Sequence, residues 1–282
     1  MNVPRFWARS TADVRNKDGR SLELAAWGWS SNDRSEAEAK ARERLARLRS
    51  RVEHGLELSH GYAYAERPLR EEIVEELRAP RGEVVGVVTR NSYGSLVLNA
   101  DRAMFVDVDL PRASFASRLG AWFGVARHRP EAETLARLEA VLASASGSSF
   151  RIYRTAAAGF RVLATDPVFK PGSPEAEKLM TQLDADPAFV RLCRAQESFR
   201  ARLTPKPWRC GCERPAVRFP REHAHDEERF SEWLQRYDKA CDAKATCRMV
   251  EEVGRRRVHP DVAPILSAHD RVTKATSRLP LA

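Results

Sequence analysis

The sequence of 282 residues is poor in cysteine, in lysine and in long apolar runs. Its five cysteines are few and odd in number, which excludes the disulfide framework of a small secreted domain. No run of about 18 apolar residues is present, so we expect no membrane-spanning helix. The first residues lack the apolar segment of a secretory signal. These absences predict a cytoplasmic protein without a membrane partner.

Charge is abundant by contrast, at 31% of residues, beside 43% hydrophobic residues, which suffice for a core and exclude global disorder. The net charge is +9, and 40 of the 48 cationic residues are arginine. Arginine enrichment has two explanations: recognition of phosphate by the guanidinium fork, or the codon usage of a GC-rich genome. The surplus is concentrated in residues 200–282, which carry +6. We therefore expect any contact with a polyanion in that third.

Three regions follow from the pattern along the chain: an N-terminal α/β layer over residues 1–80, a core over 81–212 and a basic, helical C-terminal region over 213–282. In the first region, strands at 5–9 and 22–29 precede a helix that ends near His54. The apolar residues of this helix recur every three or four positions, as a helix with one buried face requires; they are Ala37, Ala41, Leu45, Leu48 and Val52.

The core region is expected to be α+β. Two short β-rich runs within residues 83–99 precede an ordered series: a strand at 103–109, helices at 115–125 and 131–143, a hairpin of 150–155 and 159–165, helices at 174–183 and 187–198, and a strand at 200–203. This order predicts an RRM-like or ferredoxin-like split βαβ arrangement, an antiparallel sheet with helices on one face. The first and third strands of such a sheet are its central neighbours.

An Asp-x-Asp pair ends the first of these strands. Asp107 and Asp109 are two positions apart, so they project from one face of the strand together with Phe105. Two carboxylates this close repel each other unless a cation or a proton lies between them. The pair is therefore a candidate Mg²⁺ or Mn²⁺ site. The alternative is a pair of exposed aspartates at the end of a strand.

The hairpin that follows carries candidate phosphate-binding groups. Arg161 is expected beside the carboxylates, because the first and third strands are neighbours. Arg154, the Thr155 hydroxyl and the backbone N–H groups of the turn before Gly159 suit a triphosphate. The alternative is an ordinary hairpin with solvated arginines.

Together, these motifs resemble those of the archaeo-eukaryotic primase (primase-polymerase) superfamily over roughly residues 84–212. Asp107 and Asp109 match its metal-binding motif, and Thr155, Gly159 and Arg161 match its nucleotide-binding motif. The family has histidine at the position of Arg161, and its third carboxylate has no clear match here. The resemblance implies a two-metal nucleotidyl transfer, in which the aspartates hold the metals and Arg161 grips the nucleoside triphosphate.

Two further clusters lie near the start of the basic C-terminal third. Lys206 and Arg209 flank Trp208, an arrangement that can stack a base between cations, although such a tryptophan is also typical of an edge anchor. The residues with metal-binding side chains do not have the usual zinc spacing, so structural zinc is not expected; they are Cys210, Cys212, His223, His225, Cys241 and Cys247.

The motifs leave two main functions open. The first is a metal-dependent nucleotidyltransferase that resembles primase-polymerases and acts on DNA or RNA with nucleoside triphosphates. The second is a non-catalytic nucleic-acid-binding protein with an RRM-like core, for example one that controls replication of a mobile element. A third, a sugar-nucleotide transferase with an Asp-x-Asp motif, calls for parallel strands, which the hairpin-rich pattern disfavours.

Overall fold

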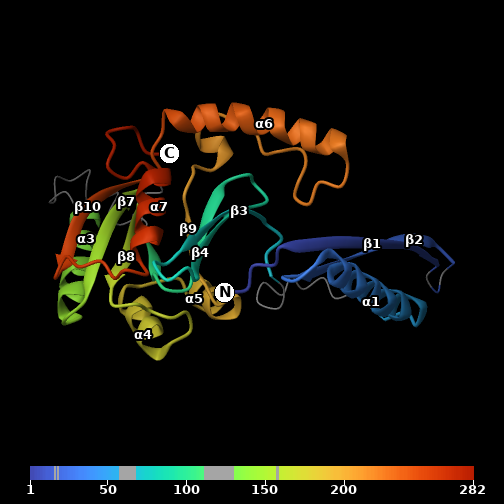
Figure 1. The fold of residues 1–282 in the computed structure, drawn as a ribbon, viewed down its shortest axis with the longest axis horizontal. Coiled ribbons are helices and arrows are strands. Elements are labelled where there is room, and N and C mark those ends of the chain that lie inside the picture. Colours follow the sequence, from blue (N-terminus) through green and yellow to red (C-terminus); the bar gives the residue numbers. More distant parts are fainter. Residues whose placement is uncertain (16, 18, 57–67, 111–129, 157–158) are drawn as a thin grey trace, which may run out of the picture. The chain divides into compact units, whose positions relative to one another are not determined.

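A computed structural model describes residues 1–15, 17, 19–56, 68–110, 130–156 and 159–282. The chain forms two compact units, Asn2–Ile73 and Val74–Ala282, the latter together with Met1. Within the described residues the fold is α+β, with three antiparallel sheets and six α-helices. Figure 1 shows the elements. The α+β class that the sequence predicts is thus confirmed.

The smaller unit consists of a β-ribbon and a helix. Strands β1 (Phe6–Arg15) and β2 (Ser21–Ser30) pair along their full length, and helix α1 (Arg34–Glu53) packs on one face of the ribbon. The contact is close because Gly28 has no side chain: a Cβ there would lie 2.0 Å from the Ala37 carbonyl oxygen. The predicted apolar face of the helix is the one that packs, with Ala37, Ala41 and Val52 buried.

The larger unit contains two four-stranded sheets. The first has the order β10-β7-β8-β6 and the second the order β3-β4-β5-β9. The strands of the first sheet are β6 (Phe105–Asp109), β7 (Ser149–Thr155), β8 (Gly159–Asp166) and β10 (Cys247–Gly254). Those of the second are β3 (Glu72–Arg78), β4 (Val84–Arg90), β5 (Leu96–Ala100) and β9 (Phe199–Arg202).

The first sheet confirms one predicted pairing and corrects two others. Strands β6 and β8 are neighbours, with Asp107 opposite Arg161 in register. However, β6 is an edge strand of the hydrogen-bonded sheet instead of a central one, because β9 pairs with β5 in the other sheet. The fourth strand is β10, from the region expected to be helical, and it pairs with β7. Its half-buried, acidic sequence hides the alternation that marks most strands.

Five helices complete the larger unit. Proline stands at the start of α3, α4 and α5, where the missing N–H is not needed. The helices are α3 (Pro130–Ser144), α4 (Pro174–Gln182), α5 (Pro187–Gln196), α6 (Ala224–Asp242) and α7 (Ala263–Thr273). The helix expected at 115–125 lies outside the described residues.

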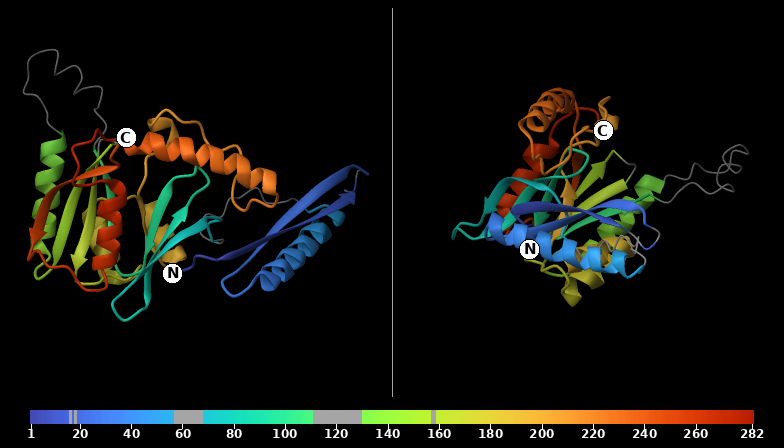
Figure 2. Two further views of the ribbon diagram at one scale, coloured as in Figure 1. Left: turned by 45° about the horizontal axis from the view of Figure 1, so that its top comes forward. Right: turned by 90° about the vertical axis from the view of Figure 1, so that its right-hand side faces the viewer.

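Helix α7 lies between the two sheets, in views from both directions (Figures 1 and 2). Ile265 packs against β4 at Gly86, and His269 packs against Phe105 of β6 and Tyr153 of β7. Both sheets and α7 share one hydrophobic core. Residues on both sides of position 212 thus belong to one compact unit, and its core includes Cys247, Ile265 and Ala268.

None of the described helices is long and apolar enough to span a membrane.

Candidate functional site

The Asp-x-Asp strand faces α7, and its first aspartate is already bound to a guanidinium. Arg161 Nε lies 2.7 Å from Asp107 Oδ1, and Arg161 Nη2 lies 3.1 Å from Asp107 Oδ2. This bidentate pair joins two directly opposed positions on β6 and β8. The Arg161 side chain is only 2% exposed, whereas that of Asp107 is 54% exposed. Arg161 is thus a buried cation whose counter-charge reaches the surface.

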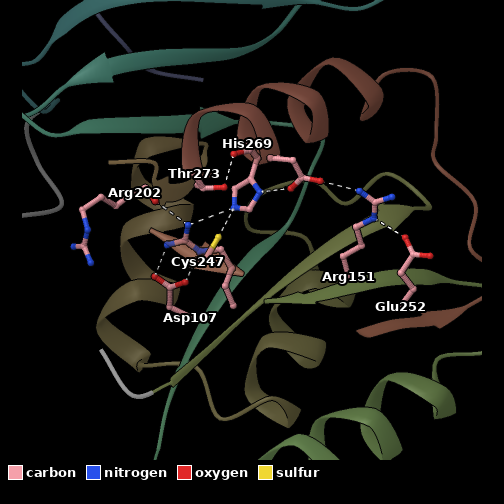
Figure 3. A network of polar contacts seen from close by, with 9 residues as sticks. Asp107, Arg151, Arg202, Cys247, Glu252, His269 and Thr273 are labelled. Atoms are coloured by element: carbon pink, nitrogen blue, oxygen red, sulfur yellow. Dashed lines mark hydrogen bonds and ion pairs between the residues drawn. The ribbon is translucent and has the colours of Figure 1, made fainter. Parts of the chain in front are cut away.

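The pair continues inward to a histidine. Arg161 Nη1 donates to the Arg202 carbonyl oxygen at 2.8 Å and lies 3.5 Å from His269 Nε2 (Figure 3). His269 Nδ1 lies 2.9 Å from Asp270 Oδ1. Because Asp270 requires a donor and Arg161 offers only N–H groups, this geometry assigns the proton of a neutral His269 to Nδ1.

The far end of the chain of contacts is a second arginine. Arg151 donates to Asp270 at 2.8 Å and to Glu252 at 2.7 Å. We call the six linked side chains the charge network; they are Asp107, Arg161, His269, Asp270, Arg151 and Glu252. Every charge in the network has an opposite charge beside it.

Burial and pairing set the protonation of the network. Burial lowers the pKa of His269 below its ordinary value of 6.5, which keeps the ring neutral. Desolvation raises the pKa of Asp107, but the charge and hydrogen bonds of Arg161 outweigh it, so the net pKa is lowered. Burial also raises the pKa of Cys247, whose sulfur lies 3.9 Å from His269 Nε2, to about 11. Cys247 is therefore a neutral thiol of the core.

The donors around Asp107 do not fit a two-metal centre. Asp109 is exposed on the same face of β6, as predicted, but both carboxylate oxygens of Asp107 accept from Arg161. Among the described residues, no group of three or more histidine, cysteine or acidic side chains is arranged to hold a metal ion.

The predicted phosphate-binding hairpin is divided between the two faces of its sheet. Arg154 is opposite Phe160 in register, so its side chain lies on the face away from Arg161, where Glu131 of α3 binds it. Arg154 and Arg161 therefore do not point at one ligand, contrary to expectation. Gly159 is explained by packing, because a Cβ there would lie 2.5 Å from the Val108 carbonyl oxygen. Thr155 ends β7 and is half-buried.

The second candidate cluster is brought together by the loop of residues 204–214, which we call the Trp208 loop. Lys206 Nζ lies 5.4 Å from the centre of the Trp208 ring, and the Arg214 guanidinium lies 4.8 Å from it. Tyr93, from the β4–β5 turn, meets the indole edge-on at 5.5 Å. Trp208 nevertheless remains 45% exposed.

The Trp208 loop is held in place by helix α6. The Tyr237 hydroxyl donates to the Pro205 carbonyl oxygen at 2.5 Å, and Trp233 Nε1 donates to the Glu213 carbonyl oxygen at 2.9 Å. The Pro207 carbonyl oxygen accepts from the Cys210 and Cys212 amides, which closes a short turn under Trp208. The loop is thus rigid before any ligand binds.

Four cations on and beside this loop form what we call the basic row: Arg202, Lys206, Arg209 and Arg214. Burial lowers the pKa of Lys206, and the charges of Arg202, Arg209 and Arg214 lower it further. Burial and the Arg161 charge likewise lower the pKa of Arg202, whose Nε is buried without a hydrogen-bond partner. Within the described part of the chain, none of the four forms an ion pair with a carboxylate. The Asp107 charge offsets part of this effect at Arg202, and the row as a whole keeps an excess of positive charge.

The cysteines near the loop are packing groups. Cys210, Cys212 and Cys241 lie in a small cluster with Phe230, Trp233 and Tyr237 of α6, and all five cysteines are free thiols. Burial raises the pKa of Cys210 and, to about 12, that of Cys241. His223 lies at the start of α6, and His225 is exposed beside Asp226.

Several residues of both regions were not predicted from the sequence. Tyr93, Arg202 and Arg214 surround the predicted trio of Lys206, Trp208 and Arg209, and His269 and Asp270 complete the network around Arg161. Arg214 lies in the same basic stretch as Trp208, so the local composition could have indicated it. Tyr93 and His269 meet their partners only through the tertiary fold, so no local pattern indicates them.

Comparisons with family models, with curated proteins and with solved structures found no match to this chain. The arrangement of the charge network and the basic row is therefore what indicates a function.

Proposed function

We propose that this protein binds nucleic acid through the basic row and the Trp208 loop. The observation that carries the proposal is the basic row itself: the charges of Arg202, Arg209 and Arg214 act together on Lys206, and none of the four cations forms an ion pair with a carboxylate of the described residues. Folding side chains of like charge together costs free energy, which a polyanion returns when it binds. Phosphates spaced along a backbone match such a row.

The position of the row in the chain supports the same ligand. The row begins at β9 and ends at the start of the stretch that leads to α6, within the third of the sequence that carries most of the net positive charge. Trp208 adds a ring that can pack on a base, which a purely ionic site for small anions does not need. The partner is thus a nucleic acid in preference to a free phosphate.

Binding of a labelled oligonucleotide, measured by fluorescence anisotropy at several salt concentrations, tests the proposal. The affinity should fall steeply with salt, with a slope of about −0.7 per phosphate contacted on a single strand. The variant K206A/R209A should bind more weakly and show a shallower slope. Exposed Arg81, in the β3–β4 turn, supplies the control R81A, which should leave both unchanged. Salt-independent binding, or equal loss in R81A, would count against the basic row.

A second candidate, nucleotidyl transfer with Mg²⁺ or Mn²⁺ and nucleoside triphosphates, is favoured by one observation. Asp107 and Asp109 project from the same face of β6 and are both exposed, beside β9, where the basic row begins. The RRM-like order is also supported, because β9 contacts β6 and accepts a hydrogen bond from Arg161 of β8, and in that order a fourth strand lies beside the first. Kinship with primase-polymerases remains part of this candidate.

Catalysis is the less supported of the two functions because Asp107 is bound to Arg161 and the described residues supply no third carboxylate. Incubation with labelled nucleotides, Mn²⁺ and a primed or unprimed template tests it. If the candidate holds, the wild type should extend or synthesise a strand and Asp109→Ala should not. Asp109 is the better choice than Asp107, because Asp107 is bound to Arg161, whereas Asp109 has no ion-pair partner among the described residues. Absence of transfer with intact oligonucleotide binding would leave the binding function alone.

A further inference from the structure

We infer that the ligand is a single strand, one base of which stacks on Trp208. This inference rests on the proposed function and narrows it to a class of nucleic acid. Trp208 is the starting point because it is, among the described residues, the only large aromatic side chain that is exposed. At 45% exposure, part of the indole surface is available to a ligand, and a ligand that covered it would gain hydrophobic stabilisation.

The indole contacts one aromatic ring and two cations. The Tyr93 and Trp208 rings meet at 78°, in an edge-on contact, and the Arg214 guanidinium lies over both, 5.0 Å from the centre of the Tyr93 ring and 4.8 Å from that of Trp208. Lys206 lies 5.4 Å from the indole. An aromatic surface beside cations is what a base and its phosphates require at the same time.

The rigidity of the Trp208 loop favours stacking further. The Arg209 amide donates to the Lys206 carbonyl oxygen at 2.8 Å, and Pro205 and Pro207 restrict the backbone on either side of Lys206. Tyr237 and Trp233 fix the two ends of the loop from α6. Little conformational entropy remains to be lost when a base stacks, so the contact is strong for its size.

Stacking distinguishes a single strand from a duplex. In a duplex the faces of the bases are covered by their neighbours, and a protein side chain reaches only edges and phosphates. In a single strand every base has a free face, and stacking on an aromatic side chain tolerates any sequence. The basic row would then contact the phosphates on either side of the stacked base.

The test compares three labelled ligands by anisotropy: an oligothymidylate of about 16 nucleotides, an abasic strand of the same length, and a duplex. Each is titrated with the wild type, W208A, W208F and the control R81A, with thermal melting as the check on folding. The wild type should bind oligothymidylate about tenfold or more tightly than the abasic strand and the duplex. W208A should lose about tenfold to a hundredfold on oligothymidylate and nothing on the abasic strand, and W208F should retain most of the affinity.

Two results would overturn the inference while leaving the proposed function intact: equal binding of duplex and single strand, or a W208A loss that is the same with and without bases. Absence of saturable binding to all three ligands would instead refute both. An acidic peptide that competes as well as the oligonucleotide would identify the surface as a protein-binding one and would also overturn the inference.

Discussion

The charge network and the basic row lie in the same unit, and they balance their charges in opposite ways. In the network, both arginines and the neutral imidazole contact a carboxylate directly. In the basic row, the four cations form no ion pair with a carboxylate of the described residues, and Lys206 and Arg214 lie over aromatic rings. Both regions meet at Arg202, whose carbonyl oxygen accepts from Arg161.

The difference separates charge that supports the fold from charge available to a ligand. Burial of an ion pair costs desolvation free energy, which the attraction between the charges offsets only when their geometry is good. The bidentate contact of Arg161 has this geometry, so we assign it to support of the fold. A row of like charges at a surface does not stabilise the fold and is retained at a cost. Substitutions in the two regions should therefore change stability in opposite directions.

The largest effect is expected from Arg161→Met. This change removes the buried guanidinium, leaves the Arg202 carbonyl oxygen without its donor and separates Asp107 from its counter-charge. The free energy of unfolding should fall by about 3 kcal/mol, measured by urea denaturation. R81M, which removes one exposed charge, should change it by less than about 0.5 kcal/mol. Equal effects of the two variants would show that the network does not stabilise the fold.

The second-largest effect is expected from acid, which should lower the stability that the charge network provides. The pKa of His269 is lowered in the folded state, so below its ordinary value of 6.5 the unfolded chain takes up a proton that the folded chain does not. Stability should thus fall from pH 7.5 to 5.5, by about 1 kcal/mol. His269→Gln, which cannot take up that proton, should flatten the profile in this window. A second loss is expected below about pH 4, where the lowered pKa values of Asp107 and Asp270 act in the same direction. A His269→Gln profile as steep as that of the wild type would assign the first loss to other groups.

Substitution in the basic row should change the free energy of unfolding in the opposite direction. Lys206→Met keeps the stem that packs near Trp208 but removes a charge repelled by three arginines. We expect the free energy of unfolding to rise by about 0.5 kcal/mol at low salt, since the group is partly solvated, and the gain to shrink as salt is added. Oligonucleotide affinity should fall in the same variant. Loss of stability in Lys206→Met would erase the contrast between the two regions.

The smallest effect is expected from Glu131→Gln, at the ion pair between α3 and Arg154. Because Glu131 is 52% exposed, its removal should change stability by no more than about 0.5 kcal/mol. The variant also frees Arg154 for a phosphate. Titration with a nucleoside triphosphate would show tighter binding only if the hairpin holds a nucleotide, so unchanged affinity would argue against that role.

Much of the fold could be predicted because its elements carry local signals. The helix of the smaller unit, the three helices that begin with proline and the β7–β8 hairpin all follow from spacing and turn residues. The pairing of β6 with β8 could also be predicted, since it follows from a common topology. The positions of β9 and β10 in the sheets could not be predicted, because the local sequence of a strand does not determine which sheet edge it pairs with.

The site residues also differ in whether the local sequence could predict them. Lys206, Trp208 and Arg209 are adjacent in the sequence, so composition indicated them together. Arg161 was expected beside Asp107, but its bidentate grip depends on His269 and the Arg202 backbone, which are distant in the chain. The expected partnership of Arg154 with Arg161 failed because odd and even positions of a strand point to opposite faces.

Strand β10 has a consequence for how the protein is made. It pairs with β7 across about 100 residues of sequence, and α7, which carries His269 and Asp270, follows it. During synthesis β7 therefore presents an open edge, and Arg161 lacks its inner neighbours, until β10 and α7 have left the ribosome. Such long-range closure slows folding and exposes strand edges to other chains. We expect nascent chains that end before Cys247 to depend on chaperones, and the emergence of β10 and α7 to release them.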